Sequence, residues 1–434
     1  MSDTRPDIVL LISHDTGRRL GCYGRGVATP NLDAVAAQGL RFDRAFTTAP
    51  QCSPSRAGLI TGMVPHRTGM LGLAHLGFDL DPSLATLPAL LAGAGYRTVL
   101  CGTEHEGSRR APDHHGYQEV MGPAGGDAGE VAETVLTALP RLGAGEPFYL
   151  CAGFFQTHRP FPEPAAGEEV EVPPYLPDRP GVRHDLAGFQ ASLRELDSAV
   201  GAIAAAVAAL PRARDTLLIY TTDHGIAFPG AKGTLHDPGL EIALIARWPA
   251  RLTAGGSTDA LVSNVDLLPT LCELAGADAP AGIDGRSLVP VLEGGASVRE
   301  EIFAEVTWHD AYQPVRGIRT EGMAYIRHLR PGPTTYLPID IHESPAGQEV
   351  RETFYQPRSG PEELYDLAQD PLQERNLIGD EAYRERHRTL ARRLEEWRLA
   401  TRDPMLEGDV QGREAPGWAE ERRAGRIPSV WDPA

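Results

Sequence analysis

Runs of consecutive apolar residues recur in the first part of the chain and lack the polar alternation of half-exposed strands. Residues 7–13 (DIVLLIS) form the first run, and similar runs lie at 146–155, 215–222 and 241–247. Strands of this composition are typical of parallel sheets that are buried on both faces. The pattern therefore predicts several strands of one buried sheet.

Helical patterns fill the intervals between these strands. One helix is expected from Pro30, with Thr29 as its N-cap, to a stop at Gly39, because these residue types suit those positions. Further helices are predicted within 86–94, 186–210 and 265–276. Alternating strands and helices indicate an α/β fold, a large and mainly parallel sheet sandwiched by helices.

The pattern changes after about residue 300. Shorter strands are expected at 301–306 and 322–328, followed by a stretch rich in proline and glycine and a helix near 384–399. The polar segment after Pro404 is expected to be an extended arm. We therefore predict a catalytic α/β domain over 1–300 and a smaller C-terminal α+β subdomain over 301–434, with antiparallel strands, a helix and an extended tail.

Composition narrows the possible partners. The chain has 434 residues and a net charge of -18, which argues against nucleic acid and against anionic membranes. An anionic substrate would need a local basic pocket. Five widely spaced cysteines do not form a disulfide framework, and residues 1–15 have no signal-peptide architecture. We expect a cytoplasmic protein; its oligomeric state is not predicted.

Residue types that bind metals or transfer protons follow four of the predicted strands: His14 with Asp15, Asp223 with His224, His105, and His158. Ligands bind beyond the carboxyl ends of the strands in such sheets, so these residues are expected on one side. Asp15 and Asp223 are hard oxygen ligands that suit Ca²⁺ or Mg²⁺, and His224 could add nitrogen or bind the substrate. Alternatively, both aspartates only cap the following helices.

Residues 51–62 read QCSPSRAGLITG and predict a helix that begins close to Cys52. Amide groups at a helix N-terminus attract anions, and Arg56 could reach the same anion. Cys52 is therefore a candidate nucleophile presented to an oxyanion. The alternative, a buried structural cysteine, fits its serine, proline and arginine neighbours poorly.

These residues resemble a known family. CSPSR matches the Cys-x-Pro-x-Arg core of the type I sulfatases of the alkaline phosphatase superfamily, and AGLITG continues that motif. RPDIVLLISHD, TTDHG and AKGTLHDPG resemble other sulfatase segments in the same order. CSPSRAGLITGMVPHRTGMLGL, FPGAKGTLHDPG and EVTWHDAYQPVRGIR look most like the sulfamidase (N-sulfoglucosamine sulfohydrolase) branch.

The resemblance implies an alkaline phosphatase-like fold and a hydrolase acting on a small anionic sulfated substrate. The scissile bond would be that of a sulfate ester or a sulfamate, with an N-sulfo amino sugar favoured. It also implies that a separate formylglycine-generating enzyme oxidises Cys52 to Cα-formylglycine. The hydrated aldehyde would attack sulfur, and the sulfated hemiacetal would then expel sulfate.

The resemblance further assigns roles to single positions. Arg56 would hold the formylglycine, and His105 would take a proton during hemiacetal collapse. His158 and Lys232 would bind the sulfate and protonate the leaving atom. The implied Ca²⁺, or another divalent metal, would be bound by Asp15, Cys52, Asp223 and His224. Beside them, either His14 is a further ligand or Asp15 alone serves.

Two positions depart from the family pattern. His14 stands where the family has the first of two adjacent acids, which would soften the site and could favour a transition metal. Thr103 stands where a lysine is common, so one positive charge on the sulfate is missing. Residues that could compensate for it, or line the substrate pocket, are Arg18, Arg19, His309 and His236.

Two other functions are compatible with the same residues. The site could act on phosphorus, as a phosphonate monoester or phosphodiester hydrolase. Alternatively, the chain could be a non-catalytic binding protein that retained the fold, although the intact CSPSR motif, His105, His158 and Lys232 argue against this.

Overall fold

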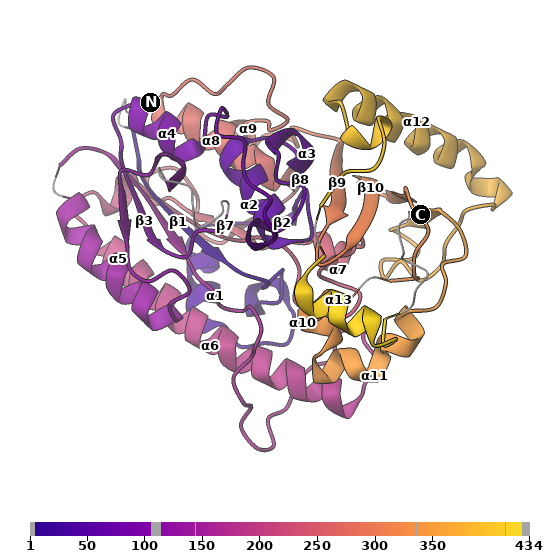
Figure 1. Cartoon of the computed structure of the whole chain (residues 1–434). Helices are drawn as coiled ribbons and strands as arrows, with labels where there is room; N and C mark the ends of the chain where they lie inside the picture. The colour runs from indigo at the N-terminus through magenta and orange to yellow at the C-terminus, as the bar shows by residue number, and fades with distance from the viewer. Residues whose placement is uncertain (1–4, 106–113, 144, 336, 413, 428–434) are drawn as a thin grey trace.

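The computed structural model describes residues 5–105, 114–143, 145–335, 337–412 and 414–427. Eight strands of the described chain form one sheet in the order β4-β3-β5-β1-β6-β7-β2-β8. Their bounds are Glu119–Met121 (β4), Arg97–Gly102 (β3), Phe148–Gly153 (β5), Asp7–Ser13 (β1), Thr216–Thr222 (β6), Leu244–Arg247 (β7), Leu40–Phe46 (β2) and Gly256–Ser263 (β8). Figure 1 shows this sheet at the centre of the larger lobe.

The sheet is mainly parallel, as expected. The run from β4 through β3, β5 and β1 to β6 is parallel throughout, and only β7 runs antiparallel to its two neighbours. The carboxyl ends of β3, β5, β1 and β6 therefore meet at a single edge of the sheet.

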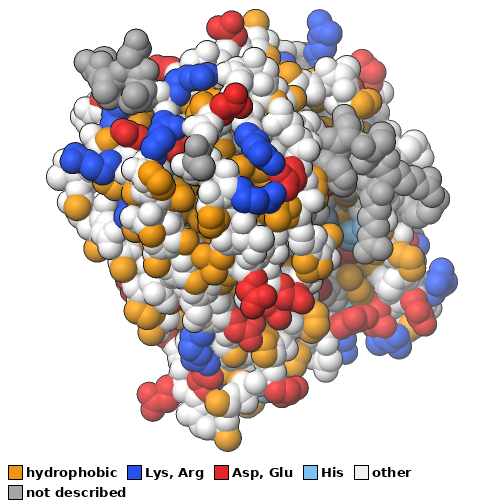
Figure 2. Space-filling model, turned by 90° about the vertical axis from the view of Figure 1, so that its left-hand side faces the viewer, with side chains coloured by type: hydrophobic (Ala, Val, Ile, Leu, Met, Phe, Trp, Pro, Cys, Tyr) orange, Lys and Arg blue, Asp and Glu red, His pale blue; other side chains and the backbone are white. Residues whose placement is uncertain are grey.

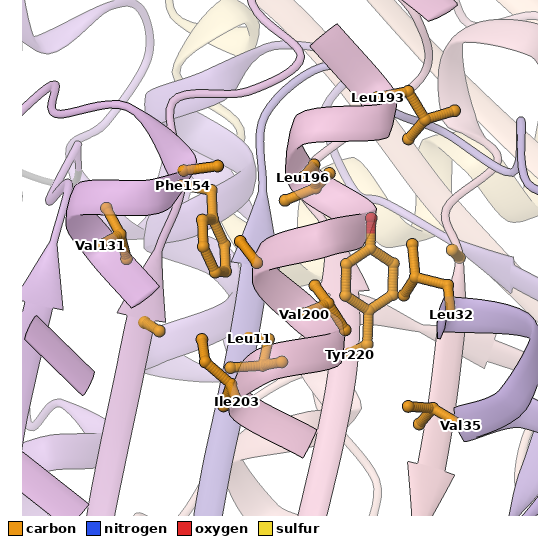
Figure 3. Packing of buried hydrophobic residues seen from close by; sticks show 14 of the residues in the cluster. Leu11, Leu32, Val35, Val131, Phe154, Leu193, Leu196, Val200, Ile203 and Tyr220 are labelled. Carbon is orange, nitrogen blue, oxygen red and sulfur yellow. The ribbon is translucent and has the colours of Figure 1, made fainter. Parts of the chain in front are cut away.

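Helices cover both faces of the large sheet. Along β1, Val9 and Leu11 pack on one side with α1 (Pro30–Ala37), α5 (Ala128–Leu142) and α6 (Pro180–Ala208). Figure 3 shows this layer, in which Leu196, Val200 and Ile203 of α6 lie over Leu11 and Tyr220. The alternate residues of β1 face the second layer, formed by α2 (Cys52–Thr61), α4 (Leu87–Gly93) and α8 (Leu267–Ala275). Burial on both faces explains why the strand is apolar at every position from Ile8 to Ile12.

A second sheet follows in the chain. Its four described strands are antiparallel in the order β12-β11-β10-β9, with bounds Glu362–Asp366, Met323–His328, Tyr312–Thr320 and Glu301–Trp308. Helix α12 (Arg384–Thr401) packs on it through Trp397, whose ring stacks on Phe303 at 4.7 Å. Three short helices, α10 (Ile339–His342), α11 (Pro345–Phe354) and α13 (Pro416–Arg423), lie beside it.

The structure corrects two local predictions. The expected extended arm after Pro404 is wrong over its described part, because α13 forms there and buries Trp418 completely. Helix α1 begins at Pro30 and stops just before Gly39, as expected, but the side chain of Thr29 at its N-cap position makes no N-cap hydrogen bond. Gly39 has another role, because a Cβ there would lie 2.2 Å from the carbonyl oxygen of Ala246 on β7.

The surface carries charges of both signs. On the face over α5 and β3, Figure 2 shows acidic and basic side chains interspersed, with one group of acidic side chains below the middle. Among the described residues, no helix is both long and apolar enough to cross a membrane.

Candidate active site

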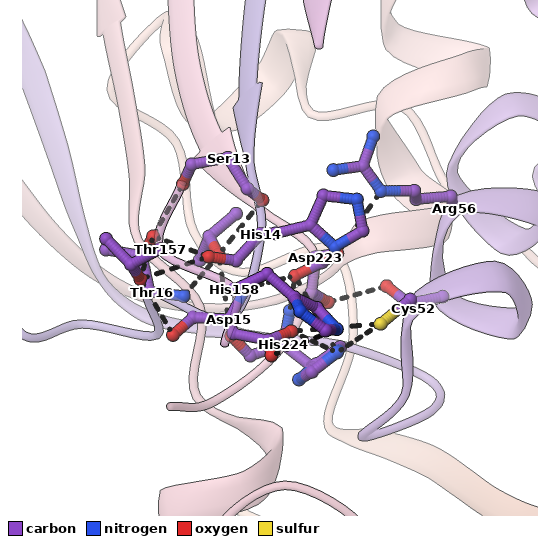
Figure 4. Close-up of polar contacts among 12 residues, drawn as sticks. Ser13, His14, Asp15, Thr16, Cys52, Arg56, Thr157, His158, Asp223 and His224 are labelled. Carbon is purple, nitrogen blue, oxygen red and sulfur yellow. Dashed lines mark hydrogen bonds and ion pairs between the residues drawn. The ribbon is translucent and has the colours of Figure 1, made fainter. Parts of the chain in front are cut away.

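The polar residues predicted at the strand ends lie together. Gly102 pairs with Gly153, Ile12 also pairs with Gly153, and Ser13 pairs with Thr222, so four neighbouring strands end at matching heights. Figure 4 shows that the side chains after three of these strands form one cluster with Cys52 and Arg56 of α2: His14, Asp15, His158, Asp223 and His224. His105, which follows β3, belongs to the same cluster, because its ring centroid lies 5.1 Å from that of His14. The structure therefore confirms the prediction that these residues lie at one edge of the sheet.

Backbone geometry fixes the two Asp-containing turns. Asp15 has a φ of 51°, a left-handed conformation that aspartate tolerates better than most residues. The amide groups of Asp15 and His224 each donate to Oδ1 of Asp223 at 2.9 Å. Gly225 lets the second turn approach its neighbour, because a Cβ there would lie 1.8 Å from the carbonyl oxygen of Pro238. The carboxylates are therefore held by the fold and do not act as helix caps.

Four buried residues offer ligand atoms that lie within 4.8 Å of one another: His14, Asp15, Cys52 and Asp223. Nδ1 of His14 is 3.0 Å from Oδ2 of Asp223. His224 adjoins the group, since its Nε2 is 3.0 Å from Oδ1 of Asp15 and 3.3 Å from the sulfur of Cys52. Its Nδ1 lies 2.9 Å from the carbonyl oxygen of Gly225, a contact that directs the Nε2 lone pair into the cluster.

A second set of possible ligands surrounds the side-chain ammonium group of Lys232. This set consists of Asp15, His158 and Asp340. Nζ of Lys232 lies 2.9 Å from Asp15, 2.8 Å from Asp340 and 3.4 Å from Nε2 of His158. The ammonium thus occupies the position that a metal ion would take. A third set, His14, Cys52 and His105, shares two residues with the first. The candidate metal site is therefore the region around the first set.

Cys52 is the first residue of α2 and is only 2% exposed. Ser55, on the next turn, donates to the carbonyl oxygen of Asp223 at 2.6 Å and so ties the helix start to the end of β6. Burial alone would raise the pKa of the Cys52 thiol, but Lys232 and His224 outweigh it and hold the pKa well below the usual value. The first turn of α2 thus presents an anion-stabilising environment.

Arg56 lies one turn further along α2 and is 1% exposed. Its Nε is 3.2 Å from Oδ2 of Asp223. Burial would raise the pKa of Asp223, but His224, His14 and Arg56 outweigh it and hold the pKa far below the usual value. Arg56 therefore connects α2 to a carboxylate that is held ionised.

Two histidines flank Cys52 with opposite protonation preferences. Burial lowers the pKa of His105, and the remaining contacts, including one with Cys52, do not restore it. Burial and Lys232 also oppose protonation of His158, but Asp15 and Cys52 outweigh them and raise its pKa to about 9. At neutral pH, His105 can accept a proton and His158 can donate one.

Asp340 is a member of the cluster that the sequence did not reveal. It comes from α10, about a hundred residues beyond Lys232, and no apolar strand or family motif precedes it. The only local signal is Pro338 before a short helix. His75 was also missed; burial and then His105 lower its pKa.

Other residues proposed from the sequence lie in different surroundings. His309 is buried, with its Nδ1 2.9 Å from Asp310, and it lies near enough to Asp340 to lower the pKa of that carboxyl. His236 is turned to the small sheet, where its Nε2 lies 2.9 Å from Glu363.

Thr103 stands where a lysine is common in the family, and Arg18 and Arg19 are the two arginines that could compensate for that lysine. The hydroxyl of Thr103 accepts a hydrogen bond from the amide of Gly125 at 3.1 Å. Arg18 is engaged by Glu241, and Arg19 by the backbone carbonyl of Glu171. Neither arginine is therefore held in the cluster to compensate.

The comparisons with known proteins agree on one family. The family model described as Sulfatase matches residues 6–277, and the model described as N-sulphoglucosamine sulphohydrolase, C-terminal, matches residues 230–360. The chain is 29% identical to the N-sulphoglucosamine sulphohydrolase of Homo sapiens over 92% of this chain and 91% of that protein. It is 32% identical to arylsulfatase A of Homo sapiens over 86% and 83%.

The fold agrees with that of a solved structure. The structure of BT4656 in complex with its substrate D-glucosamine-2-N,6-O-disulfate matches with a TM-score of 0.73 at 20% identity. The match covers 92% of this chain and 99% of that chain. The large sandwiched sheet with a smaller antiparallel sheet is thus the arrangement expected from the sequence.

Proposed function

The chain belongs to the sulfatase family, and on that premise we propose that it hydrolyses sulfamates, with an N-sulfo amino sugar as the favoured substrate. The proposal rests on one observation above all: Cys52 begins a helix that faces Lys232, His158 and a buried set of carboxylate and imidazole ligands. The match of residues 230–360 to the model described as N-sulphoglucosamine sulphohydrolase, C-terminal, supports a sulfamate rather than a sulfate ester.

A divalent cation fits the first ligand set. The ligand atoms of four buried residues lie within 4.8 Å of one another, and a fifth adjoins them, so the residues that would hold the ion are His14, Asp15, Asp223, His224 and residue 52. When bound, the ion would lower the pKa of a hydroxyl on residue 52 and neutralise charge on the sulfonate oxygens.

The donor types favour a transition metal over Ca²⁺. Calcium takes six to eight oxygen ligands, whereas this site offers two imidazoles beside its two carboxylates. We therefore expect Mn²⁺ or Zn²⁺ to raise the thermal unfolding midpoint of EDTA-treated protein more than Ca²⁺ does. His14→Asp is the matched variant and should shift that preference toward Ca²⁺. Equal stabilisation of the wild type by all three ions would contradict the reasoning.

Converted to formylglycine, residue 52 would supply a hydrated aldehyde as the nucleophile toward sulfur. The chain's own residues then divide the proton transfers. His158 and Lys232 lie together and would give a proton to the leaving atom, and His105, held neutral by burial, would accept one. The overall reaction is R–NH–SO₃⁻ + H₂O → R–NH₃⁺ + SO₄²⁻.

The test combines protein chemistry with paired substrates. Peptide mass spectrometry across Cys52, on protein co-expressed with a formylglycine-generating enzyme, should show a loss of about 18 Da. The modified enzyme should turn over N-sulfo-D-glucosamine, and Cys52→Ala should not. Turnover of an aryl phosphonate ester, with none of the sulfamate or of 4-nitrophenyl sulfate, would instead support a phosphonate monoester hydrolase.

A further inference from the structure

The short helix α10 inserts one carboxylate into the catalytic cluster from the C-terminal part of the chain. Oδ2 of Asp340 lies 2.8 Å from Nζ of Lys232, and its Oδ1 accepts the amide hydrogen of Ile341 at 3.0 Å. The helix is anchored by the amide of Ile339, which donates to Asp310 at 2.7 Å, and by Ile341, which is fully buried. Asp340 is therefore held in place by the fold.

Asp340 also borders a cavity of about 410 Å³ that lies outside the metal-ligand set. Acidic side chains outnumber basic ones in its wall, and the ionisable residues lining it are Arg159, Glu163, His184, Asp185, Asp340 and Glu343. Arg159 is neutralised by Asp185, with Nη2 2.7 Å from Oδ2. The cavity thus favours a cationic or hydroxyl-rich group, not a second anion.

One residue therefore touches both the proton donor for the leaving atom and the cavity beside it. We propose that Asp340 selects sulfamates over sulfate esters by accepting a hydrogen bond from the nitrogen of an amino-sugar leaving group seated in this cavity. This inference rests on the proposed function and deepens it, because it identifies the residue that distinguishes S–N from S–O substrates.

The two bond types present opposite chemistry to a carboxylate. The bridging nitrogen of a sulfamate carries a hydrogen that it can donate to a carboxylate. As the S–N bond breaks, its electron pair stays on nitrogen and takes a proton from Lys232, so a neutral amine leaves, and its N–H groups can still donate to Asp340. The product amine then takes a second proton and becomes an ammonium ion. The bridging oxygen of an ester has only lone pairs and leaves as a neutral alcohol, so an adjacent carboxylate stabilises the first leaving group and repels the second.

The electrostatic surroundings keep Asp340 in the required form. Burial would raise the pKa of its carboxyl, but Lys232, His158 and His309 outweigh burial and hold the pKa far below the usual value. The side chain is 20% exposed, so a substrate atom can reach it.

Asp340→Asn is the test, because asparagine keeps the shape and removes the charge. We expect kcat/KM for N-sulfo-D-glucosamine to fall about 10- to 100-fold, and that for 4-nitrophenyl sulfate to stay within about threefold. Glu349→Gln is the matched control, since Glu349 is an exposed carboxylate on the neighbouring helix α11 and does not line the cavity. All variants are normalised to their formylglycine content by peptide mass spectrometry.

A binding measurement covers the case of a variant that folds poorly. D-Glucosamine should inhibit the wild type about tenfold more strongly than D-glucose, and the Asp340→Asn variant should lose that difference. Equal losses on both sulfur substrates would overturn the inference and make Asp340 a positioning residue for Lys232. A wild type that cleaves only the ester overturns it while leaving a sulfatase, whereas a formylglycine-bearing wild type inert on both substrates overturns the proposed function itself.

Discussion

Lys232→Met tests how much Lys232 stabilises the two carboxylates that it contacts. Nζ of Lys232 is 2% exposed and bridges Asp15 at 2.9 Å and Asp340 at 2.8 Å. Methionine keeps the length of the side chain but leaves two carboxylates without their shared cation. Removing one partner of a buried ion pair costs about 3–5 kcal/mol, so we expect a loss of that size in the free energy of unfolding of metal-free protein.

A double-mutant cycle separates this stability effect from catalysis. Asp340→Asn alone should cost about 1–2 kcal/mol, and the double variant should lose about 1–3 kcal/mol less than the sum of the two single losses. Urea unfolding followed by circular dichroism in EDTA measures these values. Turnover of the sulfamate should fall about 10²- to 10⁴-fold in Lys232→Met and should not recover in the double variant. Strictly additive stability losses would refute a direct Lys232–Asp340 pair.

Two further predictions concern the fold around the site. Arg316→Met should cost about 3–5 kcal/mol in urea unfolding, because the fully buried Arg316 makes two 2.9 Å contacts with Asp403. Arg327→Met, at the position opposite Arg316 on β11 but with a side chain that is 42% exposed, should cost under about 0.5 kcal/mol. For Asp7, burial outweighs Arg212 and raises the pKa to about 6, so the folded state holds this proton more tightly than the unfolded state and stability falls as pH rises from about 4 through 6. Asp7→Asn should therefore gain about 2 kcal/mol on the wild type between pH 4.5 and 7.5, and an unchanged difference across that interval would contradict the assignment.

The parts of the site that follow a buried strand could be predicted from the sequence. The apolar run of β1 is continuous because both faces are covered, and the first polar residues after it, His14 and Asp15, must then lie at the sheet edge. The same reasoning places Asp223 and His158. No pairing information was needed, since parallel strands bring their carboxyl ends together whatever their order.

The parts that depend on packing between distant segments could not be predicted. Strand β2 carries four intermediate positions and three charged residues, so its sequence lacks the continuous apolar pattern of the central strands. Helix α13 has a mostly polar sequence, and Trp418 alone signals that it is covered. Asp340 and Lys232 are more than a hundred residues apart in the sequence, and the local pattern of apolar and polar residues does not indicate such a contact.

Charge in the completed cluster links the bound cation to anion binding. Three carboxylates face two permanent side-chain cations, and these residues are Asp15, Asp223, Asp340, Arg56 and Lys232. One excess negative charge remains among these five residues. Protonated His158, with a pKa of about 9, and His224, whose pKa Asp223 and Asp15 raise well above its usual value against burial, add two positive charges. The Cys52 thiolate adds one negative charge, so the balance is neutral. In a chain whose overall charge is -18, a neutral pocket gives a sulfonate no net attraction. A divalent cation would make the pocket positive, so inorganic sulfate should bind detectably by calorimetry to metal-loaded protein and at least about tenfold more weakly in EDTA. Equal sulfate affinity in both conditions would mean that Arg56 and Lys232 alone hold the anion, and that the carboxylates around them are screened.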